Sequence, residues 1–166
     1  MTGNRGSRNA VPASASRSPE TAGVISGDPA AVERAGEGCK TRGAKRVIML
    51  KVSGAFHSPL MQPAVAGLRE ALGAATFRDP RFPVIANATA TPVTAAGDAT
   101  RLLADQLTAA VRWTDSVRAA AEQAPGARWV EVGPGAVLSG LLKKIVNGAS
   151  ATTLGTADEV TKFLES

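Results

Sequence analysis

The chain has 166 residues, 44% hydrophobic and only 4% aromatic, so one α/β domain with a core of Ala, Val, Leu and Ile is expected. A single cysteine, Cys39, excludes an internal disulfide, and a single histidine, His57, excludes a zinc site built from a Cys/His cluster. The net charge of +5 lacks the basic stripe and stacking aromatics of a nucleic-acid binder, so no nucleic-acid partner is expected. No apolar run approaches the ~18 residues of a membrane span, so no membrane association is expected. An unpaired cysteine fits a reducing compartment, which favours the cytoplasm.

The first segment in chain order is a polar tail. Residues 1–22 contain almost no large apolar side chain and carry Arg5, Arg8 and Arg17 against Glu20, a net charge of +2. Such a segment cannot offset the entropy cost of ordering itself, so we expect it to be disordered. The Arg/Ser bias also resembles an organelle transit peptide, but no amphipathic helix is visible, which favours a tail without a structural role.

A strand and a helix follow the tail. Branched apolar residues predict a short strand at 24–26, and the next stretch predicts a helix over 27–43. Asp28 suits the N-cap, Pro29 suits the first helical position, and Gly43 ends the helix. Internal glycines weaken this helix, so packing against a neighbouring element must support it.

Two apolar features of the same region predict buried structure. Cys39 shares a helical face with Val32, Ala35 and Gly36, so it is expected to be a small buried hydrophobe and not a nucleophile. The run KRVIMLKV at 45–52 is rich in branched apolar residues and predicts a second strand.

The rest of the chain alternates between helices and strands. Ser58 is expected to cap a helix with Pro59 at its first position and with an apolar stripe of Leu60, Met61, Ala64, Val65, Leu68 and Leu72. A helix follows with Leu102, Leu103 and Leu107 directed inward, and Thr114 is expected to cap the next one. In full, the pattern predicts strands at 82–87, 127–132 and 151–154 and helices at 98–111, 114–124, 136–146 and 157–165. This alternation predicts a mainly parallel sheet covered by helices.

Three polar groups fall where predicted strands end. His57 follows the strand that ends near Val52, Asn87 ends the next strand, and the loop EVGPG at 131–135 follows a third. Ligands of open parallel sheets bind beyond the carboxyl ends of the strands, so these groups are candidates for a functional site. Each also has a structural interpretation as a cap, a solvated loop or a tight turn. Histidine is the most frequent general base near neutral pH, which makes His57 the strongest of the three.

Four blocks of the sequence together resemble a known enzyme family. They are AVERAGEGCKTRGAKR, VSGAFHSPLM, DQLTAAVRWTDSV and VEVGPGAVLSGLLKKI, in order and without large gaps from about Val24 to the C-terminus. These blocks are similar to the malonyl-CoA:acyl carrier protein transacylases of bacterial fatty-acid synthesis. Acyltransferase domains of polyketide synthases share them, whereas the AVERAG, GAKR and VRW details favour the free-standing enzymes.

The resemblance implies a reaction and roles for three residues. In that family a serine attacks the thioester of malonyl-CoA, and the acyl group then moves to the phosphopantetheine thiol of acyl carrier protein. His57 matches the histidine of the family's FHS motif, which is the base, and Gln106 matches the residue whose backbone carbonyl orients that imidazole. Asn87 matches an asparagine near the pocket, with ordering of a loop as its expected role. The resemblance implies no bound cofactor; the coenzyme A thioester and acyl carrier protein are substrates and partners.

Other parts of the family's machinery have no match in this chain. No G-x-S-x-G elbow, which would carry the nucleophilic serine, occurs in it. The family's carboxylate-binding arginine and its glutamine near the oxyanion hole match nothing in residues 1–23. The implied fold is an incomplete hydrolase-like parallel-sheet acyltransferase core. In it, residues 23–52 are a remnant of an inserted ferredoxin-like subdomain, and residues 53–166 are the C-terminal part of the large domain.

Three functions stay open at this point. The first is an acyltransferase, represented here in part, that is inactive alone because its base has no nucleophile to deprotonate. The second is a non-catalytic module that binds acyl carrier protein, or the C-terminal half of a split polyketide-type acyltransferase. The third is a different hydrolase that pairs His57 with another serine. The missing elbow argues against the third function, since Ser58 is predicted to cap a helix and Ser53 lies on the strand side.

Overall fold

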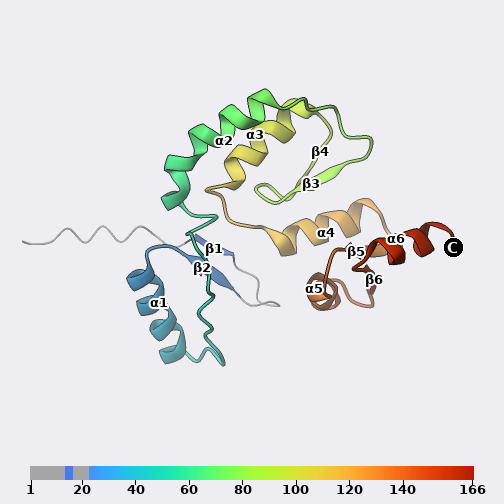
Figure 1. Cartoon of the computed structure of the whole chain (residues 1–166). Coiled ribbons are helices and arrows are strands. Elements are labelled where there is room, and N and C mark those ends of the chain that lie inside the picture. The colour runs from blue at the N-terminus through green and yellow to red at the C-terminus, as the bar shows by residue number, and fades with distance from the viewer. Residues whose placement is uncertain (1–13, 17–22) are drawn as a thin grey trace, which may run out of the picture.

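The computed structural model describes residues 14–16 and 23–166, and Figure 1 shows them as an open arc. At one end lies an N-terminal arm, formed by residues 14–16 and 23–52. It contains β1 (Ser14–Ser16), β2 (Val24–Ser26) and α1 (Pro29–Thr41), with β1 and β2 paired antiparallel. The predicted disordered tail therefore includes one strand, while the rest of that prediction lies outside the described residues.

Helix α1 begins and ends as its sequence predicts. The Asp28 carboxylate accepts a hydrogen bond from the backbone N–H of Ala31 at 3.1 Å, and Pro29 holds the first helical position. Gly43 has a φ of +91°, the left-handed conformation that glycine adopts at low cost just after a helix. The only buried residue of the helix is Gly36, whose missing side chain leaves space for Val47.

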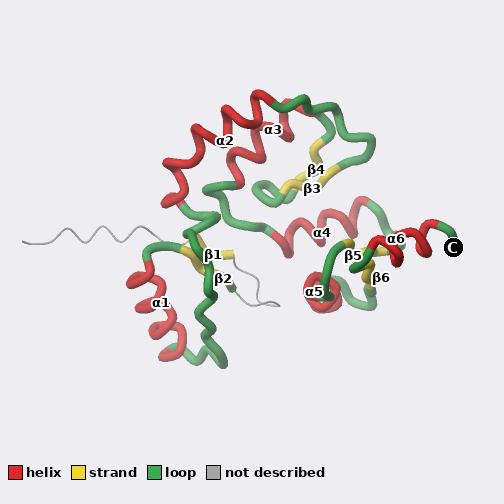
Figure 2. The backbone as a smooth tube through the Cα atoms, in the orientation of Figure 1, coloured by secondary structure: helices red, strands yellow, loops and turns green. Residues whose placement is uncertain are grey.

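Two predictions for the N-terminal arm are wrong, and both errors concern burial. Cys39 is exposed, and Gly36 is the only residue of α1 that is buried. Residues 45–52 do not form a strand; Figure 2 shows the whole stretch between α1 and the next helical turn as loop. A strand is stable only when another strand satisfies its backbone groups, and no described strand pairs with this segment.

The bend of the arc is made of paired helices and a hairpin. The helical turn η1 (Pro59–Met61) leads into α2 (Gln62–Ala74), which packs on α3 (Ala96–Gln106). As predicted, the Ser58 side chain caps this start and accepts from the N–H of Leu60. Between α2 and α3, β3 (Val84–Ala86) pairs antiparallel with β4 (Thr91–Val93).

The inward face of α3 differs by one residue from the prediction. Leu102 and Ala104 are buried, as is Val65 of α2, whereas Leu103 is 47% exposed. Successive helical positions lie 100° apart, so Leu102 and Leu103 point in different directions, and only Leu102 is buried. Ala104 lies on the face of α3 that, with Arg69 and Leu72 of α2, lines a shallow pocket.

A C-terminal arm, residues 113–166, completes the arc. It contains α4 (Trp113–Gln123), β5 (Trp129–Val132), α5 (Val137–Ile145), β6 (Ala151–Leu154) and α6 (Ala157–Leu164). Strands β5 and β6 are parallel, with Trp129 opposite Ala151 and Val132 opposite Leu154. Thr114 is not the N-cap of α4 as predicted: Arg112 holds that position, and Thr114 is buried in the first turn.

The expected mainly parallel sheet is not present in the described residues. Only β5 and β6 pair in parallel, and the other two sheets are antiparallel pairs of short strands that are consecutive in the chain. The buried apolar residues accordingly are few and lie in three regions, the last two of which are linked by contacts between α4 and α5. One lies between α2 and α3, one lies around the β3–β4 hairpin and α4, and one lies between α5 and β6. The fold is α/β, but it has no single central core.

Two absences hold for the residues that the structure describes. None of their helices combines the length and the apolar character that crossing a membrane requires. None of their His, Cys, Asp and Glu side chains gather in a group that could hold a metal ion.

Candidate active site

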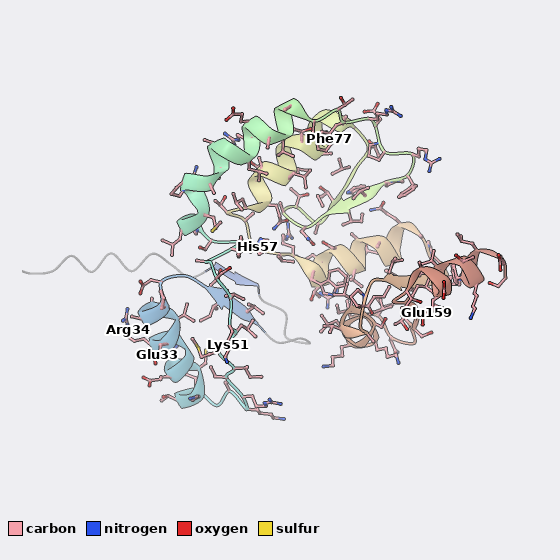
Figure 3. All side chains as sticks on the ribbon, in the orientation of Figure 1. Glu33, Arg34, Lys51, His57, Phe77 and Glu159 are labelled. Atoms are coloured by element: carbon pink, nitrogen blue, oxygen red, sulfur yellow. The ribbon has the colours of Figure 1, made fainter. Side chains whose placement is uncertain are left out.

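His57 lies at the junction between the N-terminal arm and the α2–α3 helices, as its label in Figure 3 shows. It is half-buried, and its φ of +60° places it in the left-handed region, which non-glycine residues rarely adopt. Its backbone N–H donates to the carbonyl of Leu107 at 3.1 Å, which holds this conformation. Strained backbone of this kind concentrates at functional sites.

The imidazole of His57 is held by Gln106, the residue that precedes Leu107 in the chain. Nδ1 of His57 lies 3.0 Å from the backbone carbonyl of Gln106. Gln106 ends α3 and Leu107 is its C-cap, so both carbonyls lie where a helix offers no backbone donor of its own. The geometry therefore matches the contact that the family resemblance implied for this pair. The catalytic roles of both residues stay predictions.

The Gln106 side chain adds a contact that the sequence did not predict. Its Nε2 lies 3.1 Å from Nδ1 of His57 and also donates to the carbonyl of Ala109 at 3.2 Å. In a neutral imidazole, Nδ1 of His57 has two possibilities. It carries a proton and donates to the Gln106 carbonyl, or it has no proton and accepts from the Gln106 side-chain amide. The carbonyl contact leaves Nε2 of His57 as the free lone pair, which a general base needs, whereas the amide contact favours the opposite tautomer.

Ser58 follows His57 but is fully engaged in structure. Its side chain is buried, and its hydroxyl donates to the carbonyl of Ala55 at 2.6 Å while accepting from the N–H of Leu60 at 3.3 Å. A hydroxyl held in this way orders the turn that carries His57. It is therefore a cap, as predicted, and not a nucleophile.

The contact that Asn87 makes in this region comes from its backbone carbonyl and not from its side chain. Its carbonyl accepts from the N–H of Arg112 at 3.1 Å, and the Arg112 guanidinium donates to the carbonyl of Thr89 at 2.8 Å. The same guanidinium forms an ion pair with Asp115 at 2.8 Å. Arg112 thus joins the β3–β4 turn to the start of α4. No hydrogen bond links Asn87 to His57 among the described residues. Arg112 belongs to the VRW detail of the sequence blocks, but its contacts with the β3–β4 turn were not predicted.

The third predicted group, the loop 131–135, is ordered by a carboxylate. Glu131 accepts from the N–H groups of Leu138 at 3.0 Å and Ser139 at 2.7 Å, and also from the Ser139 hydroxyl. The hydrogen bond from the Ser139 hydroxyl is the largest influence on Glu131 and lowers the pKa of its carboxyl; desolvation opposes it, and the two backbone hydrogen bonds lower the pKa further. Gly133 and Gly135 turn the chain with φ of +132° and +96°. This Glu131–α5 clasp connects the end of β5 to the first turn of α5.

Comparison with known proteins identifies the class to which this fold and site belong. Residues 4–165 match the family model of the acyl transferase domain. The chain therefore belongs to the acyl transferase domain family. The match begins before Val24, so it extends further towards the N-terminus than the sequence blocks indicated.

Within that family, the similar proteins are malonyl transacylases. The chain is 44% identical over 122 residues to the malonyl CoA-acyl carrier protein transacylase of Bacillus subtilis, covering 74% of this chain and 38% of that protein. It is 43% identical over 143 residues to the Escherichia coli protein of the same name, covering 86% and 46%. A solved complex of a malonyl-transacylase with its type II polyketide synthase acyl-carrier protein is also similar. Its TM-score is 0.79 at 41% identity, over 87% of this chain and 47% of that one. The chain thus spans less than half the length of the curated relatives it matches.

Proposed function

We propose that this chain forms part of a malonyl CoA-acyl carrier protein transacylase, which transfers malonyl from coenzyme A to the phosphopantetheine thiol of acyl carrier protein. One observation carries the proposal: the 3.0 Å contact from Nδ1 of His57 to the Gln106 carbonyl. It occurs in a chain 43–44% identical to proteins that bear this name. A histidine held through Nδ1 presents Nε2 as a base for a serine hydroxyl.

The proposed chemistry is a double displacement. The serine Oγ bonds to the thioester carbon as its proton passes to Nε2 of His57, and the carbon–sulfur bond breaks as the coenzyme A sulfur takes that proton. The phosphopantetheine thiol then gives its proton to Nε2, its sulfur bonds to the malonyl carbon, and the serine oxygen leaves and recovers the proton. His57 is unchanged at the end, so it acts as base and acid in turn.

Within this proposal, the chain supplies the base and its orienting carbonyl but not the nucleophile. Its sequence contains no G-x-S-x-G, and the hydroxyl of Ser58 is occupied. The serine, the carboxylate-binding arginine and the glutamine near the oxyanion hole would come from the part of the domain that this chain does not span. The β5–α5 loop ordered by Glu131 and the turn that contains Asn87 are proposed as parts of the scaffold.

The proposal also assigns the two parts of the chain to subdomains of the family's fold. Residues 23–52 are assigned to a remnant of a ferredoxin-like subdomain and residues 53–166 to the C-terminal part of a hydrolase-like core. The likeness to solved malonyltransferases, with TM-scores of 0.72–0.79, supports an α/β fold of that kind but not these bounds. We place the protein in the cytoplasm, where its proposed substrates occur, and assign it no bound cofactor.

Intact-mass spectrometry with malonyl-CoA tests the proposal. The chain alone should gain no malonyl group. A single polypeptide that joins it to the N-terminal part of the Bacillus subtilis relative should gain one, on the elbow serine, and should pass it to acyl carrier protein. A malonyl adduct on a serine of this chain alone would contradict the proposed division of roles.

One observation favours a second candidate, a module that only binds acyl carrier protein. Five exposed cations and no acid lie between residues 40 and 51, namely Lys40, Arg42, Lys45, Arg46 and Lys51. Such a run attracts an acidic partner, and the attraction weakens as salt screens it. Binding of carrier protein to the chain that falls with salt, together with no transfer by the joined polypeptide, would favour this candidate over the transacylase.

A further inference from the structure

One peptide unit joins Phe56 to His57, and both of its polar groups are held by segments remote in the chain. The Phe56 carbonyl accepts a hydrogen bond from the Ser26 hydroxyl at 2.7 Å, across 30 residues of sequence. The His57 N–H donates to the Leu107 carbonyl at 3.1 Å, and no backbone N–H of the described residues donates to the Phe56 carbonyl. Ser26 therefore fixes one side of this peptide unit, and Leu107 fixes the other.

The position of Ser26 is itself fixed by two elements of the N-terminal arm. Ser26 is the last residue of β2 and lies opposite Ser14 of β1. Two residues later, Asp28 caps the start of α1. Figure 1 shows these strands beside the segment that leads into α2, and Ser26 is half-buried there. A hydroxyl on backbone that is already ordered gives up little further entropy when it donates, so this contact is preorganised.

The orientation of this peptide unit sets the backbone conformation of His57. Phe56 and His57 lie in a turn, and the φ of His57 is +60°. A flip of the peptide between the two central residues of a β-turn interconverts types I and II and reverses the sign of φ at the second residue. The flipped peptide would give His57 an ordinary negative φ, but its polar groups would point away from Ser26 and Leu107. The two hydrogen bonds therefore hold the left-handed conformation.

Typical magnitudes indicate that one of these hydrogen bonds alone does not suffice. A left-handed backbone lowers the population of a non-glycine residue by a factor of roughly ten. One neutral hydrogen bond raises it by a factor of roughly five, so two together give about 25 and outweigh the cost, whereas one does not. Without the Ser26 hydroxyl, the flipped peptide is therefore favoured, and Nδ1 of His57 leaves its position 3.0 Å from the Gln106 carbonyl.

We infer that Ser26 is a positioning residue for His57. Its hydroxyl holds the peptide unit before His57 in the orientation that sets the imidazole against the Gln106 carbonyl. The consequence for catalysis rests on the proposed function, whereas the effect on the His57 backbone does not. Ser26 is not itself the nucleophile, because its hydroxyl proton is directed at the Phe56 carbonyl and no hydrogen bond joins it to the imidazole among the described residues.

Nuclear magnetic resonance of ¹⁵N-histidine-labelled protein tests the effect on the backbone. His57 is the only histidine, so the full chain with a histidine-free tag gives one amide and one imidazole. In the joined polypeptide, the signals that His57→Ala removes identify the same residue. A left-handed φ brings the amide proton close to Hα of its own residue, so a strong NOE between these two protons is expected. Ser26→Ala should lower the ratio of left-handed to flipped conformer about fivefold and shift the imidazole nitrogens.

Two further variants separate the hydroxyl of Ser26 from general effects of substitution in the arm. Ser26→Thr keeps the hydroxyl and suits a strand, so it should retain the strong NOE. Thr41→Ala is the matched control, because the Thr41 hydroxyl also donates to a carbonyl, that of Glu37 at 3.1 Å, but within α1. It should leave the His57 signals unchanged. Unchanged His57 signals in Ser26→Ala, or no strong NOE in either unsubstituted protein, would overturn the inference.

Malonyl transfer by the joined polypeptide gives a second readout and separates the two proposals. Ser26→Ala should lower kcat about two- to fivefold with KM unchanged, since it displaces the base and removes no substrate contact. Ser26→Thr should restore kcat. An unchanged kcat in Ser26→Ala would overturn the positioning role. If the unsubstituted joined polypeptide transfers no malonyl group at all, the proposed function fails, and the His57 signals still decide whether Ser26 holds the backbone of His57.

Discussion

His57 is held by the main chain, and this determines how mutations nearby should act. Its N–H and Nδ1 contact the carbonyls of Leu107 and Gln106, two consecutive groups that no side-chain substitution removes. The imidazole orientation should therefore be robust to most changes at these two positions. Loss of the imidazole itself has no substitute, because His57 is the only histidine in the chain.

In the joined polypeptide, His57→Ala should lower kcat/KM for malonyl transfer by roughly three orders of magnitude or more, as removal of the base does in serine hydrolases. Steady-state transfer to carrier protein measures this. An unchanged circular dichroism spectrum and melting temperature of the joined polypeptide serve as the control for folding. A rate near that of the unsubstituted protein would remove His57 from the mechanism.

Gln106→Ala should have a much smaller effect, below about tenfold, because the carbonyl that accepts from Nδ1 is retained. The Gln106 amide also lies 3.1 Å from Nδ1, where it favours the unproductive tautomer. Its removal should therefore lower the population of that tautomer, which ¹⁵N shifts of the imidazole report. A loss as large as that of His57→Ala would show that the side chain, and not the carbonyl, orients the ring.

At the scale of elements, the Glu131–α5 clasp connects the end of β5 to the start of α5 through hydrogen bonds to the Glu131 carboxylate. The lowered pKa of Glu131 means that its bonds to Leu138 and Ser139 favour the charged form. Their contribution to stability is thus complete above the ordinary glutamate pKa of about 4.3 and is lost as the pH falls through the lower folded-state value.

Glu131→Gln should therefore weaken the first turn of α5 at neutral pH and matter little at low pH, where the natural residue is also uncharged. Hydrogen exchange of the Leu138 and Ser139 amides, corrected for intrinsic rates, measures this. A several-fold loss of protection at pH 7 is expected, and it should disappear at a pH well below the ordinary glutamate pKa of about 4.3. Glu159→Gln, in the capping box of α6, is the matched control and should leave the α5 amides unaffected.

Local signals in the sequence predicted the elements whose partners are close in the chain. The caps at Asp28 and Ser58, the strands at 24–26 and 151–154, and most helix bounds agree with the structure. The prediction failed for residues 45–52 and Cys39, since both needed a neighbouring layer that no described residue supplies. The 3.0 Å approach of Gln106 to His57 followed from family resemblance alone, because 49 residues separate the two.

At the scale of the whole molecule, three small clusters take the place of one core. Cooperative unfolding depends on contacts that connect all elements, and among the described residues no extensive packing connects the elements of the N-terminal arm with those of the C-terminal arm. The chain alone should therefore behave as a loosely packed protein with exposed apolar surface.

The purified chain should bind a hydrophobic dye strongly and unfold over a broad temperature range, with weak near-UV circular dichroism. The joined polypeptide should lose most of the dye signal and unfold sharply. A sharp melt of the chain alone, as a monomer, would show instead that it is a self-sufficient domain.

The position of the Gln106 and Leu107 carbonyls has an electrostatic consequence. Both lie at the C-terminal end of α3, where aligned peptide dipoles place about half a negative charge. An imidazolium formed at His57 during the reaction would be stabilised by this helix end, which serves where many serine enzymes use a buried carboxylate. A peptide dipole cannot be protonated. The orientation of the His57 ring should therefore not depend on the charge state of a second group, as it would if an aspartate held the imidazole.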